Sequence, residues 1–463
     1  MAEKTRRLTA VVLAAGQGTR MKSPLPKVLH PVAGTPILVR VIQALREVGA
    51  TEIRIVVGHQ ENLVRQVVEP LGVSCFRQTE QKGTAHAVLS AQIDDIDGDV
   101  LILNGDHPLL TGKNLTPFVE EFRSGKASLA LATCELTEPG HYGRIVRQKS
   151  EVRAIVEAKD ASADTLAIRE VNTGIYLVRA ELLKKLLPQI RNQNAQGEYY
   201  LTDLVELAAT VPGQVLGLKV PDELGWGVNT QAELAEASRR VFQRKRDALM
   251  ASGVLFIDPL NTYVEDSVQV GEATVLYPGV FLKGRTRLGR FVVVEPHCMI
   301  MDSEIGDSVE IKAGSYIERS RVHTKATLGP YARLRPETEI GEEAHVGNFV
   351  EMKKVRFGAR SKAGHLAYLG DADVGTDTNI GCGTITCNYA VDRKKYKTEI
   401  GNHVFVGSDS QFIAPVRIGD GAVIGSGSTI TKDVPDKALA VARSRQIVKE
   451  NYSPVKKPKT SET

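Results

Sequence analysis

An apolar residue recurs at every sixth position between about Leu282 and Ile430. This spacing fits neither an α-helix, which repeats every ~3.6 residues, nor a strand that alternates every second residue. A six-residue repeat predicts one short strand and one turn per hexapeptide, so that three hexapeptides form one triangular coil of a parallel β-helix. A sandwich of evenly spaced strands would not keep so strict a period. The clearest runs are Leu288, Val294, Ile300; Ile305, Ile311, Ile317; Val322, Leu328, Leu334, Ile340, Val346, Met352; and Ile400, Val406, Phe412, Ile418, Ile424, Ile430.

The six-residue step is lost twice, between Met352 and Val374 and between Ile380 and Ile400, although the repeats on both sides are intact. We therefore expect both segments to be loops that leave the coil. Long loops on a rigid scaffold commonly carry function. These two segments contain Lys353, His365, Tyr368, Asn388 and Tyr389.

The chain has 463 residues, too many for one core, and this length predicts two or three domains. A net charge of +4, from 59 basic and 55 acidic residues, is too small to indicate nucleic-acid binding. The basic excess gathers near the end of the chain, where a solvated tail is the simpler interpretation and an anion-binding segment the alternative. Its basic residues are Arg443, Arg445, Lys449, Lys456, Lys457 and Lys459.

Five scattered cysteines without metal-type spacing favour a reducing cytoplasm. The first seven residues are rich in charge and no signal-type apolar core follows them. No run of about eighteen apolar residues occurs either. We therefore expect neither export nor stable membrane insertion.

The first part of the chain alternates apolar strand-like runs with amphipathic helical stretches, which predicts an α/β domain with a doubly wound, mostly parallel sheet. Leu8 to Ala14 reads as a buried first strand. Helices are expected after Thr35-Pro36, ending at Gly49, and after Gly83-Thr84, ending near Ala91. Further strands are expected at Ile53 to Val57, Val73 to Phe76, Val100 to Leu103, Ser128 to Cys134 and Ile175 to Val178.

Residues 229–250 read as one connecting helix, because Thr230 and Glu233 form a capping-box pattern and Gly253 follows the last turn. Leu234, Val241 and Ala248 share one face of this helix. We therefore expect an α/β domain at 1–228, a linker helix at 229–250, and a β-helix domain with a basic tail at 251–463.

The first strand opens into a glycine-rich loop that contains Gly16 and Gly18, followed by Arg20 and Lys27. Convergent backbone N–H groups and two cations suit a phosphate chain. A tight turn without a ligand is an equally common reason for such glycines. The loop lacks the Gly-Lys-Ser/Thr ending of a P-loop and the third glycine of a dinucleotide fingerprint.

The longer string from Leu13 to Lys27, with the segments around Gln78, Gln81 and Asp106, closely resembles the signature of sugar-phosphate nucleotidyltransferases. That resemblance implies a UTP and sugar-phosphate site with Mg²⁺ held by Asp106 and Asn229. Many relatives have an aromatic residue where this chain has Asn104. The implied binding residues are Leu13, Ala14, Ala15, Gly16, Gly18, Thr19, Lys27, Gln78, Gln81, Gly83, Thr84, Asn104, Gly105, Asp106, Gly143, Glu157, Asn172 and Asn229.

The resemblance also implies the reaction, an in-line attack of a sugar 1-phosphate oxygen on the α-phosphorus of UTP with release of pyrophosphate. Such a reaction needs positioning and charge neutralisation more than covalent chemistry from the protein. Arg20 and Lys27 are the expected catalytic cations.

Arg335 and Lys353 each follow an inward apolar residue of the ladder, so both are expected to point outward, where two cations suit a phosphate or simply face solvent. His365 is a candidate general base, because an imidazole is the side chain best suited to proton removal at neutral pH. A lone histidine is more often structural, but the position in a ladder gap near Tyr368 favours catalysis.

The segments from Gly347 to Lys354, Lys362 to His365 and Gly383 to Tyr389, together with the amino-terminal signature, resemble the bacterial bifunctional N-acetylglucosamine-1-phosphate uridylyltransferases and glucosamine-1-phosphate acetyltransferases over nearly the whole chain. The family implies a left-handed coil, trimers, and synthesis of UDP-N-acetylglucosamine, a cell-wall precursor, from glucosamine 1-phosphate by acetyl transfer from acetyl-CoA and then uridylyl transfer to N-acetylglucosamine 1-phosphate.

The same resemblance assigns roles at the second site. His365 is the implied base, and the implied acceptor-binding residues are Arg335, Lys353, Tyr368 and Asn379. The implied acetyl-CoA contacts are Cys382, Asn388, Tyr389, Ser408, Ser426 and Arg443. Some relatives carry Ala where this chain has Cys382 and Ser426. Direct attack by the amine needs no acyl-enzyme, so we expect Cys382 to have a packing role.

Two alternatives stay open at this point. In the first, only nucleotidyl transfer is retained and the β-helix is a structural or regulatory module. In the second, the chain is a non-catalytic scaffold, which would predict decay of the glycine-rich loop or of Asp106, and neither has decayed.

Overall fold

The computed structural model describes residues 6–211 and 213–452. The chain divides into two compact units, and the boundary lies between Arg244 and Lys245 within helix α9 (Gln231–Ala251). Each unit is described separately below. Lys456, Lys457 and Lys459 of the expected basic tail lie outside the described residues. In the described part of the chain, every helix is too short or too polar to cross a membrane.

The first unit is built on a mixed sheet in which β1, β4, β5 and β6 run parallel and β7 runs parallel to β11. β10 is antiparallel to both of its neighbours, β6 and β7. It also pairs with β8 (Arg144–Gln148), which forms a hairpin with β9 (Glu151–Val156). The predicted mostly parallel sheet is therefore confirmed. The strand order is β11 (Val215–Lys219), β7 (Leu129–Glu135), β10 (Glu170–Arg179), β6 (Asp99–Asn104), β1 (Leu8–Ala14), β4 (Glu52–Val57) and β5 (Ser74–Arg77).

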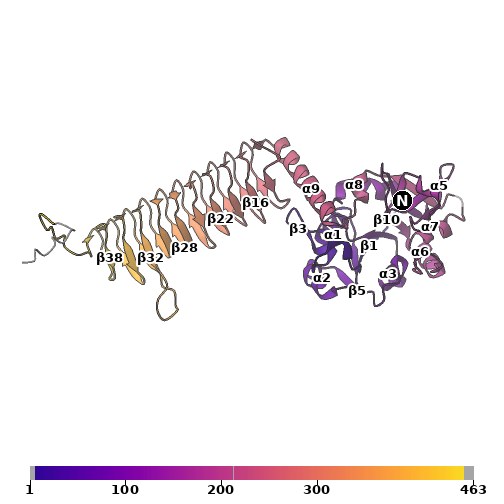
Figure 1. Ribbon diagram of the computed structural model, residues 1–463, viewed down its shortest axis with the longest axis horizontal. Coiled ribbons are helices and arrows are strands. Elements are labelled where there is room, and N and C mark those ends of the chain that lie inside the picture. Colours follow the sequence, from indigo (N-terminus) through magenta and orange to yellow (C-terminus); the bar gives the residue numbers. More distant parts are fainter. Residues whose placement is uncertain (1–5, 212, 453–463) are drawn as a thin grey trace, which may run out of the picture. The chain divides into compact units, whose positions relative to one another are not determined.

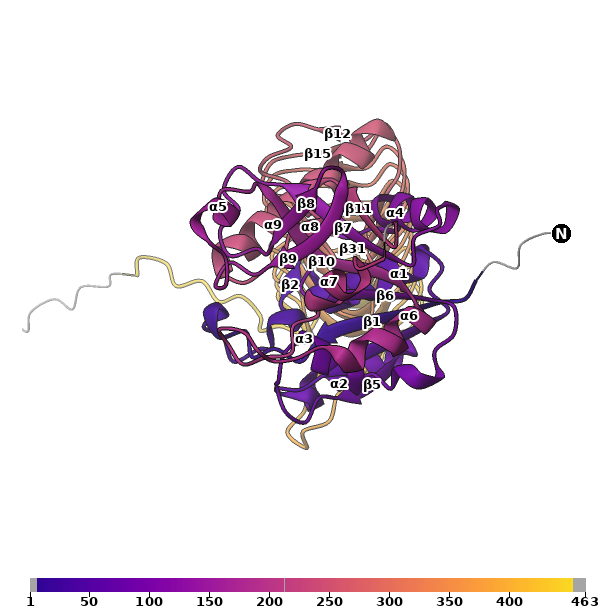
Figure 2. The ribbon, with the colours of Figure 1, turned by 90° about the vertical axis from the view of Figure 1, so that its right-hand side faces the viewer.

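Helices cover both faces of this sheet (Figures 1 and 2). On one face, α1 (Ile37–Glu47), α2 (Glu61–Val68) and α4 (Gly112–Ser124) pack on the alternate strand residues typified by Ala10 and Val12. On the other face, α3 (Thr84–Ser90), α6 (Ala180–Leu186) and α7 (Asp203–Ala208) pack on the strand residues that point the opposite way, such as Val11. Two separate cores on one sheet are what a doubly wound arrangement requires.

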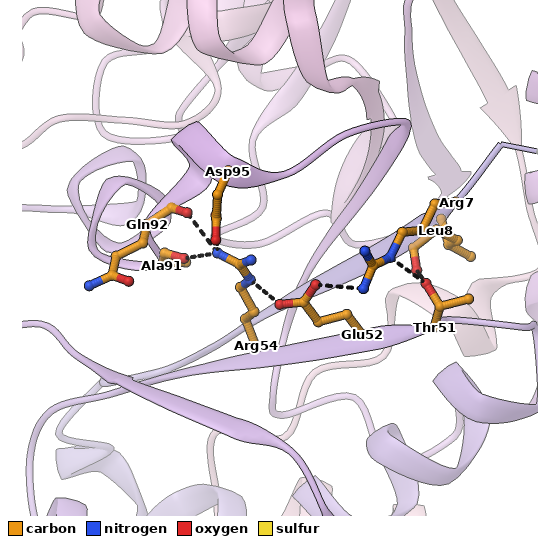
Figure 3. Close-up of polar contacts among 8 residues, drawn as sticks. All are labelled: Arg7, Leu8, Thr51, Glu52, Arg54, Ala91, Gln92 and Asp95. Carbon is orange, nitrogen blue, oxygen red and sulfur yellow. Dashed lines mark hydrogen bonds and ion pairs between the residues drawn. The ribbon is translucent and has the colours of Figure 1, made fainter.

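A polar network joins β4 to the end of α3 (Figure 3). The side chain of Arg54 on β4 is only 5% exposed and donates hydrogen bonds to the carbonyl oxygens of Ala91 (3.0 Å) and Gln92 (2.6 Å). It also forms ion pairs with Asp95 (2.8 Å) and Glu52 (2.7 Å). These partners satisfy a nearly buried guanidinium that would otherwise be costly.

The start of α9 has the predicted capping box. Thr230 Oγ1 accepts a hydrogen bond from the Glu233 amide (3.2 Å), and Glu233 Oε2 accepts one from the Thr230 amide (2.9 Å). Val241 is buried, but Ala248 is exposed and Leu249 is buried in its place. The face changes because the last turns of α9 pack on the first coil of the second unit rather than on the first unit's core.

The second unit is a parallel β-helix whose coils contain three short strands each (Figure 1). A seventeen-stranded sheet runs from β13 (Tyr263–Val264) to β38 (Thr429–Ile430) and supplies two sides of the coil. An eleven-stranded sheet supplies the third side. Its strands are β12 (Leu255–Phe256), β15 (Val275–Leu276), β18 (Val293–Val294), β21 (Glu310–Ile311), β24 (Thr327–Leu328), β27 (His345–Asn348), β29 (Lys362–His365), β31 (Asn379–Ile380), β34 (Phe405–Val406), β37 (Val423–Ile424) and β39 (Leu439–Ala440).

The inward residues of the coils form one continuous core. Leu328, Val346, Ala363 and Ile380 are register partners in successive coils and all are buried. No single coil could bury its interior, so the core exists only because the coils stack. Every apolar residue of the predicted ladder is buried.

The expectation that Met352 to Val374 leaves the coil is wrong. β28 (Glu351–Phe357), β29 and β30 (Tyr368–Val374) continue the three sides. Phe357, Ala363 and Leu369 fill the interior. The period appears lost because the steps from Met352 to Phe357 and from Leu369 to Val374 span five residues, and because the inward position between them is a small alanine.

The second gap contains the expected loop. β32 (Ile385–Cys387) first continues the coil with Thr386 facing inward, and residues 388–397 then project from it before β33 (Thr398–Ile400) resumes the stack (Figure 1). A bridge between Tyr389 and Lys395 holds the base of this projecting loop.

Candidate active sites

The first site lies beyond the carboxyl ends of β1 and β6, where ligands bind in doubly wound sheets. Two adjoining cavities of about 280 Å³ and 240 Å³ occupy this edge. Both are lined by Leu13, Thr84, Asn104 and Asp106, so they form one mouth with two halves.

The glycine-rich loop turns sharply so that its cations face this mouth. Gly18 has a φ of 62°, and a Cβ at this position would lie 2.8 Å from Lys27 Cβ. Only glycine therefore permits Lys27 to pack here. The short turn Thr19–Met21 carries Arg20, and the turn Lys27–Leu29 begins with Lys27.

Arg20, Lys27, Asp106 and Asn229 form one cluster at the mouth. Lys27 Nζ forms an ion pair with Asp106 and donates to Asn229 Oδ1 (3.2 Å), and Arg20 Nη2 donates to the same oxygen (2.9 Å). Burial by itself would raise the pKa of the Asp106 carboxyl, but the Lys27 ammonium, the neighbouring His107 and hydrogen bonds together hold this pKa below its usual value. Asp106 is therefore an anion at neutral pH.

The oxygens of this cluster fit a hard divalent cation. Asp106 Oδ1 is buried and accepts no hydrogen bond in the described structure, and His107 Nε2 approaches it only to 3.6 Å. Asn229 adds a second oxygen. No group of three His, Cys, Asp or Glu side chains suited to a metal occurs among the described residues. Mg²⁺ at nucleotide sites commonly takes only one or two protein carboxylates and completes its shell with water and phosphate.

The larger half of the mouth is braced by backbone and amide contacts. Gln81 Nε2 donates to Ala15 O (2.6 Å), and Gln78 Nε2 donates to Gly83 O (3.2 Å). Gly83 has a φ of 108°, and a Cβ here would lie 2.5 Å from Tyr199 O. Glu198 also lines this half, although it carries no family signature and sequence reasoning missed it.

The other half is lined by Gly143, Glu157, Asn172 and Asn229. The Asn172 amide donates to Tyr176 Oη (2.7 Å) and accepts from the Gly174 amide (3.0 Å), so its orientation is set. Burial raises the pKa of the Glu157 carboxyl. Sequence reasoning missed several lining residues that follow no motif: His107, His141, Tyr176, Leu201 and Thr202.

Three expected binding residues shape this mouth without lining either cavity. Gly18 and Thr19 lie in the turn described above. Gly105 follows β6, and a Cβ there would lie 3.2 Å from Leu38 Cδ1 and 3.3 Å from Leu13 O, so this glycine permits the two strands' ends to approach.

A column of polar side chains marks the second site. His365 pairs with Asn348 in the preceding coil, and the register of β29 with β31 and of β30 with β32 places Cys382 in the next coil at the same level. The registers of the two following coils continue the column with Ser408 and Ser426. Successive members are separated by about 4.8 Å along the stack. These residues therefore form a straight row that runs along the β-helix across several coils.

His365 is exposed at the end of β29 and does not face the packed interior. Arg443 Nη1 donates to Ser426 O (2.8 Å), which places this tail residue at the far end of the column. Four of the expected acetyl-CoA residues thus share one edge with His365: Cys382, Ser408, Ser426 and Arg443.

A cluster of cations lies on the neighbouring side of the coil. The Lys395 ammonium lies against that of Lys353 and, with Arg335, lowers the pKa of Lys353. Arg335 also pairs with Glu351 (2.9 Å). Sequence reasoning missed Lys395, because it lies in the projecting loop, far along the chain from Lys353.

The remaining expected residues are more dispersed. The Asn388 amide donates to Asp371, whereas Tyr389 is 63% exposed on the projecting loop. Tyr368 begins β30, one corner after His365. Asn379 pairs with Lys362 and Phe405 on the third side of the coil.

Comparisons with known proteins agree with both halves of the chain. Residues 10–172 match the family model of the MobA-like NTP transferase domain, and residues 397–432 match that of the bacterial transferase hexapeptide (six repeats). A protein of Bdellovibrio bacteriovorus named bifunctional protein GlmU is 60% identical over 98% of this chain and 99% of its own length. Proteins of the same name from Trichlorobacter lovleyi and Pelobacter propionicus are 46% and 44% identical, over 96% and 98% of this chain and 97% and 99% of their own lengths.

Proposed function

The chain belongs to the family of bifunctional GlmU proteins, and from this membership we propose how its two sites divide the work. The chain synthesises UDP-N-acetylglucosamine by acetyl transfer to glucosamine 1-phosphate and uridylyl transfer to N-acetylglucosamine 1-phosphate. The observation that carries this function is the 60% identity over nearly the full length of a bifunctional relative. In our proposal, residues 1–228 form the uridylyltransferase, 229–250 the linker helix, and 251–463 the acetyltransferase, a left-handed β-helix with its tail.

At the first site, we propose that the sugar 1-phosphate oxygen attacks the α-phosphorus of UTP and pyrophosphate leaves. Arg20 and Lys27 face the phosphate chain and offset the negative charge that shifts among the phosphate oxygens in the transition state. Asp106 and Asn229 would hold Mg²⁺, which when bound supplies further charge neutralisation on the phosphates. Their clustering with both cations at one mouth supports this assignment.

The two halves of the mouth suit the two substrates. The half braced by Gln78, Gln81 and Gly83 is proposed to hold the nucleoside, because amides and backbone there can pair with a base edge. The half lined by Glu157 and Asn172 is proposed to hold the acetamido sugar, because a carboxylate and an amide bind hydroxyl and acetamide groups.

At the second site, we propose that His365 removes a proton from the glucosamine 1-phosphate amine as this nitrogen attacks the thioester carbonyl of acetyl-CoA. The new C–N bond forms, the C–S bond breaks and the coenzyme A thiolate leaves, so no acyl-enzyme is needed. Arg335 and Lys353 bind the sugar phosphate, and Lys395 adds a third cation to them. Tyr368 and Asn379 orient the sugar.

Acetyl-CoA is proposed to lie along the column from Cys382 to Ser426, with Asn388 and Tyr389 beside it and Arg443 near its phosphates. The straight row across several coils supports this placement, because a pantetheine arm is extended. Cys382 packs beside acetyl-CoA in this column and does not act as a nucleophile.

We further propose that three copies of the chain associate through the β-helix. Tyr331 and Phe349 stack their rings 5.6 Å apart at one corner of the coil, and Leu366 follows them in the next coil. All three side chains are more than half exposed. Phe349 and Leu366 directly follow Asn348 and His365, so a second copy packed on this corner would border the acetyl-transfer column.

A cytoplasmic location completes the proposal. Acetyl-CoA and UTP are intracellular metabolites, and all five cysteines carry free thiols.

Two assays on the purified chain test the division of labour. Thiol release from acetyl-CoA with glucosamine 1-phosphate reports the second site, and pyrophosphate release from UTP with N-acetylglucosamine 1-phosphate reports the first. We expect Asp106→Ala to abolish only pyrophosphate release. Loss of both activities in this variant, with its melting temperature unchanged, would contradict two independent sites.

A further inference from the structure

The segment between α8 (Asp222–Gly225) and α9 presents Asn229 to the first site. Its side-chain oxygen accepts hydrogen bonds from Arg20 (2.9 Å) and Lys27 (3.2 Å). The Asn229 side-chain amide lies on a short connection, so it can bind a cation only if the main chain of this residue is held in place.

Glu233, in the first turn of α9, accepts a hydrogen bond that the capping box does not require. Its Oε2 accepts the Thr230 amide (2.9 Å), which is the ordinary capping-box bond. The same oxygen also accepts the Asn229 amide at a shorter distance of 2.7 Å. The second bond lies outside the helix, at the residue that carries the site's amide oxygen.

Two other contacts tie the same region to the site. The Val228 amide donates to Asp106 O (3.0 Å), which links the segment to the strand end that carries the site's carboxylate. Gln231 Nε2 donates to Met21 O (3.0 Å), which links the start of α9 to the turn that carries Arg20. The Asn229 main chain itself is held by Glu233.

We propose that Glu233 is a positioning residue for uridylyl transfer, whose carboxylate fixes the Asn229 main chain so that the Asn229 amide oxygen stays directed at the Asp106 side of the mouth. This inference rests on the proposed function, in which Asn229 and Asp106 hold the divalent cation. Removal of the carboxylate frees Asn229 and weakens cation binding. Loss of a group that orients a metal ligand typically costs about 10-fold or more in metal affinity or activity.

The test compares two substitutions that both break the capping box. Glu233→Ala removes both hydrogen bonds that Oε2 accepts. Thr230→Ala removes the hydrogen bond that the Thr230 hydroxyl oxygen accepts from the Glu233 amide, and it leaves the Glu233 carboxylate and the Asn229 amide in place. Mn²⁺ alone serves as the probe, and its binding is followed by electron paramagnetic resonance of the free ion. Melting temperature and acetyl transfer are measured for every variant.

We expect the Kd for Mn²⁺ to rise about 10-fold in Glu233→Ala and to stay unchanged in Thr230→Ala, although both variants lose some thermal stability. Glu233→Gln keeps an oxygen acceptor, and its Kd should lie between those of the wild type and Glu233→Ala. Acetyl transfer should be unchanged in all three. Equal Mn²⁺ affinities in Glu233→Ala and Thr230→Ala would overturn the inference, since the carboxylate would then act only as a helix cap.

Asn229→Ala separates this inference from the function on which it rests. If Asn229→Ala binds Mn²⁺ as the wild type does, the proposed cation site itself is wrong. If Asn229→Ala weakens binding and Glu233→Ala does not, the cation site stands and the role of Glu233 is wrong.

Discussion

Lys27 forms an ion pair with Asp106 across the mouth of the first site, although the two residues come from different segments of the chain. The lysine belongs to the glycine-rich loop after β1, and the aspartate follows β6, the strand beside β1. Neighbouring parallel strands end at the same edge of the sheet, so the loop after β1 and the residue after β6 lie close together and their side chains can form an ion pair. This pair keeps the carboxylate charged in a buried place.

Replacement of Lys27 by methionine should slow uridylyl transfer by at least about 100-fold, because the phosphate chain loses a preorganised cation. Acetyl transfer should be unaffected. Steady-state pyrophosphate release measures the first effect and thiol release the second. Lys22→Met, in the same loop and exposed, is the matched control. A fall of similar size in the control would show that the effect is one of loop stability.

Glu157→Gln should stabilise the ligand-free protein at neutral pH and much less at acidic pH. Burial raises the pKa of this carboxyl above its ordinary 4.5. The folded state therefore binds the proton more tightly than the unfolded state, and the stability cost of the charged form grows as pH rises from about 4.5 through the raised value. Below that window the cost disappears. Melting temperatures of both proteins at pH 7.5 and near pH 4 measure the difference.

The same variant should raise KM for N-acetylglucosamine 1-phosphate, because a neutral amide is a weaker acceptor for a sugar hydroxyl than a carboxylate. A variant that is equally stabilised at both pH values would contradict the burial argument. An unchanged KM would contradict the place of Glu157 in the sugar half of the mouth.

His365→Ala should reduce acetyl transfer by about 100- to 10,000-fold, the usual contribution of a general base, and leave uridylyl transfer intact. His323→Ala is the matched control, since His323 is an exposed histidine of the same β-helix that pairs with Glu339 (2.7 Å) outside the column. Retention of full thiol release in His365→Ala would exclude the histidine as the base.

Arg54→Met should lower the free energy of unfolding of the first unit by about 1–3 kcal/mol, because the carbonyl oxygens of Ala91 and Gln92 lose their partner in a nearly buried place. Arg7→Met should cost less than about 1 kcal/mol, because the Arg7 side chain is 60% exposed in its pair with Glu52. Thermal or urea unfolding measures both. Equal losses would mean that burial does not govern this network (Figure 3).

Phe349→Asp should dissociate the proposed trimer, because a carboxylate at an apolar contact must be desolvated without a partner. Light scattering coupled to size-exclusion chromatography measures the mass, and thiol release should fall with it. Phe291→Asp, an equally exposed aromatic in an earlier coil, is the control. A Phe349→Asp trimer with normal mass would place the subunit contact elsewhere on the coil.

Much of the architecture could be predicted from local patterns. The inward residues of the β-helix follow a fixed spacing because each strand presents one side chain to the interior. The strand Leu8–Ala14 and the capping box of Thr230 with Glu233 were likewise readable, since both depend on residues close in the chain. The prediction for Met352 to Val374 is wrong, because two five-residue steps interrupt the sequence period although this coil pairs regularly with its neighbours.

The chemical groups, in contrast, became sites only through packing. The amino-acid order supplied the cations, the strand-end carboxylate, the histidine and the hexapeptide period, all of which are properties of short stretches. The contact of Lys395 with Lys353, the column that aligns His365 with Ser426, and the contacts of Arg20 and Lys27 with Asn229 depend on registers and loop paths. Those are set by the mutual packing of segments distant along the chain, which no local pattern encodes.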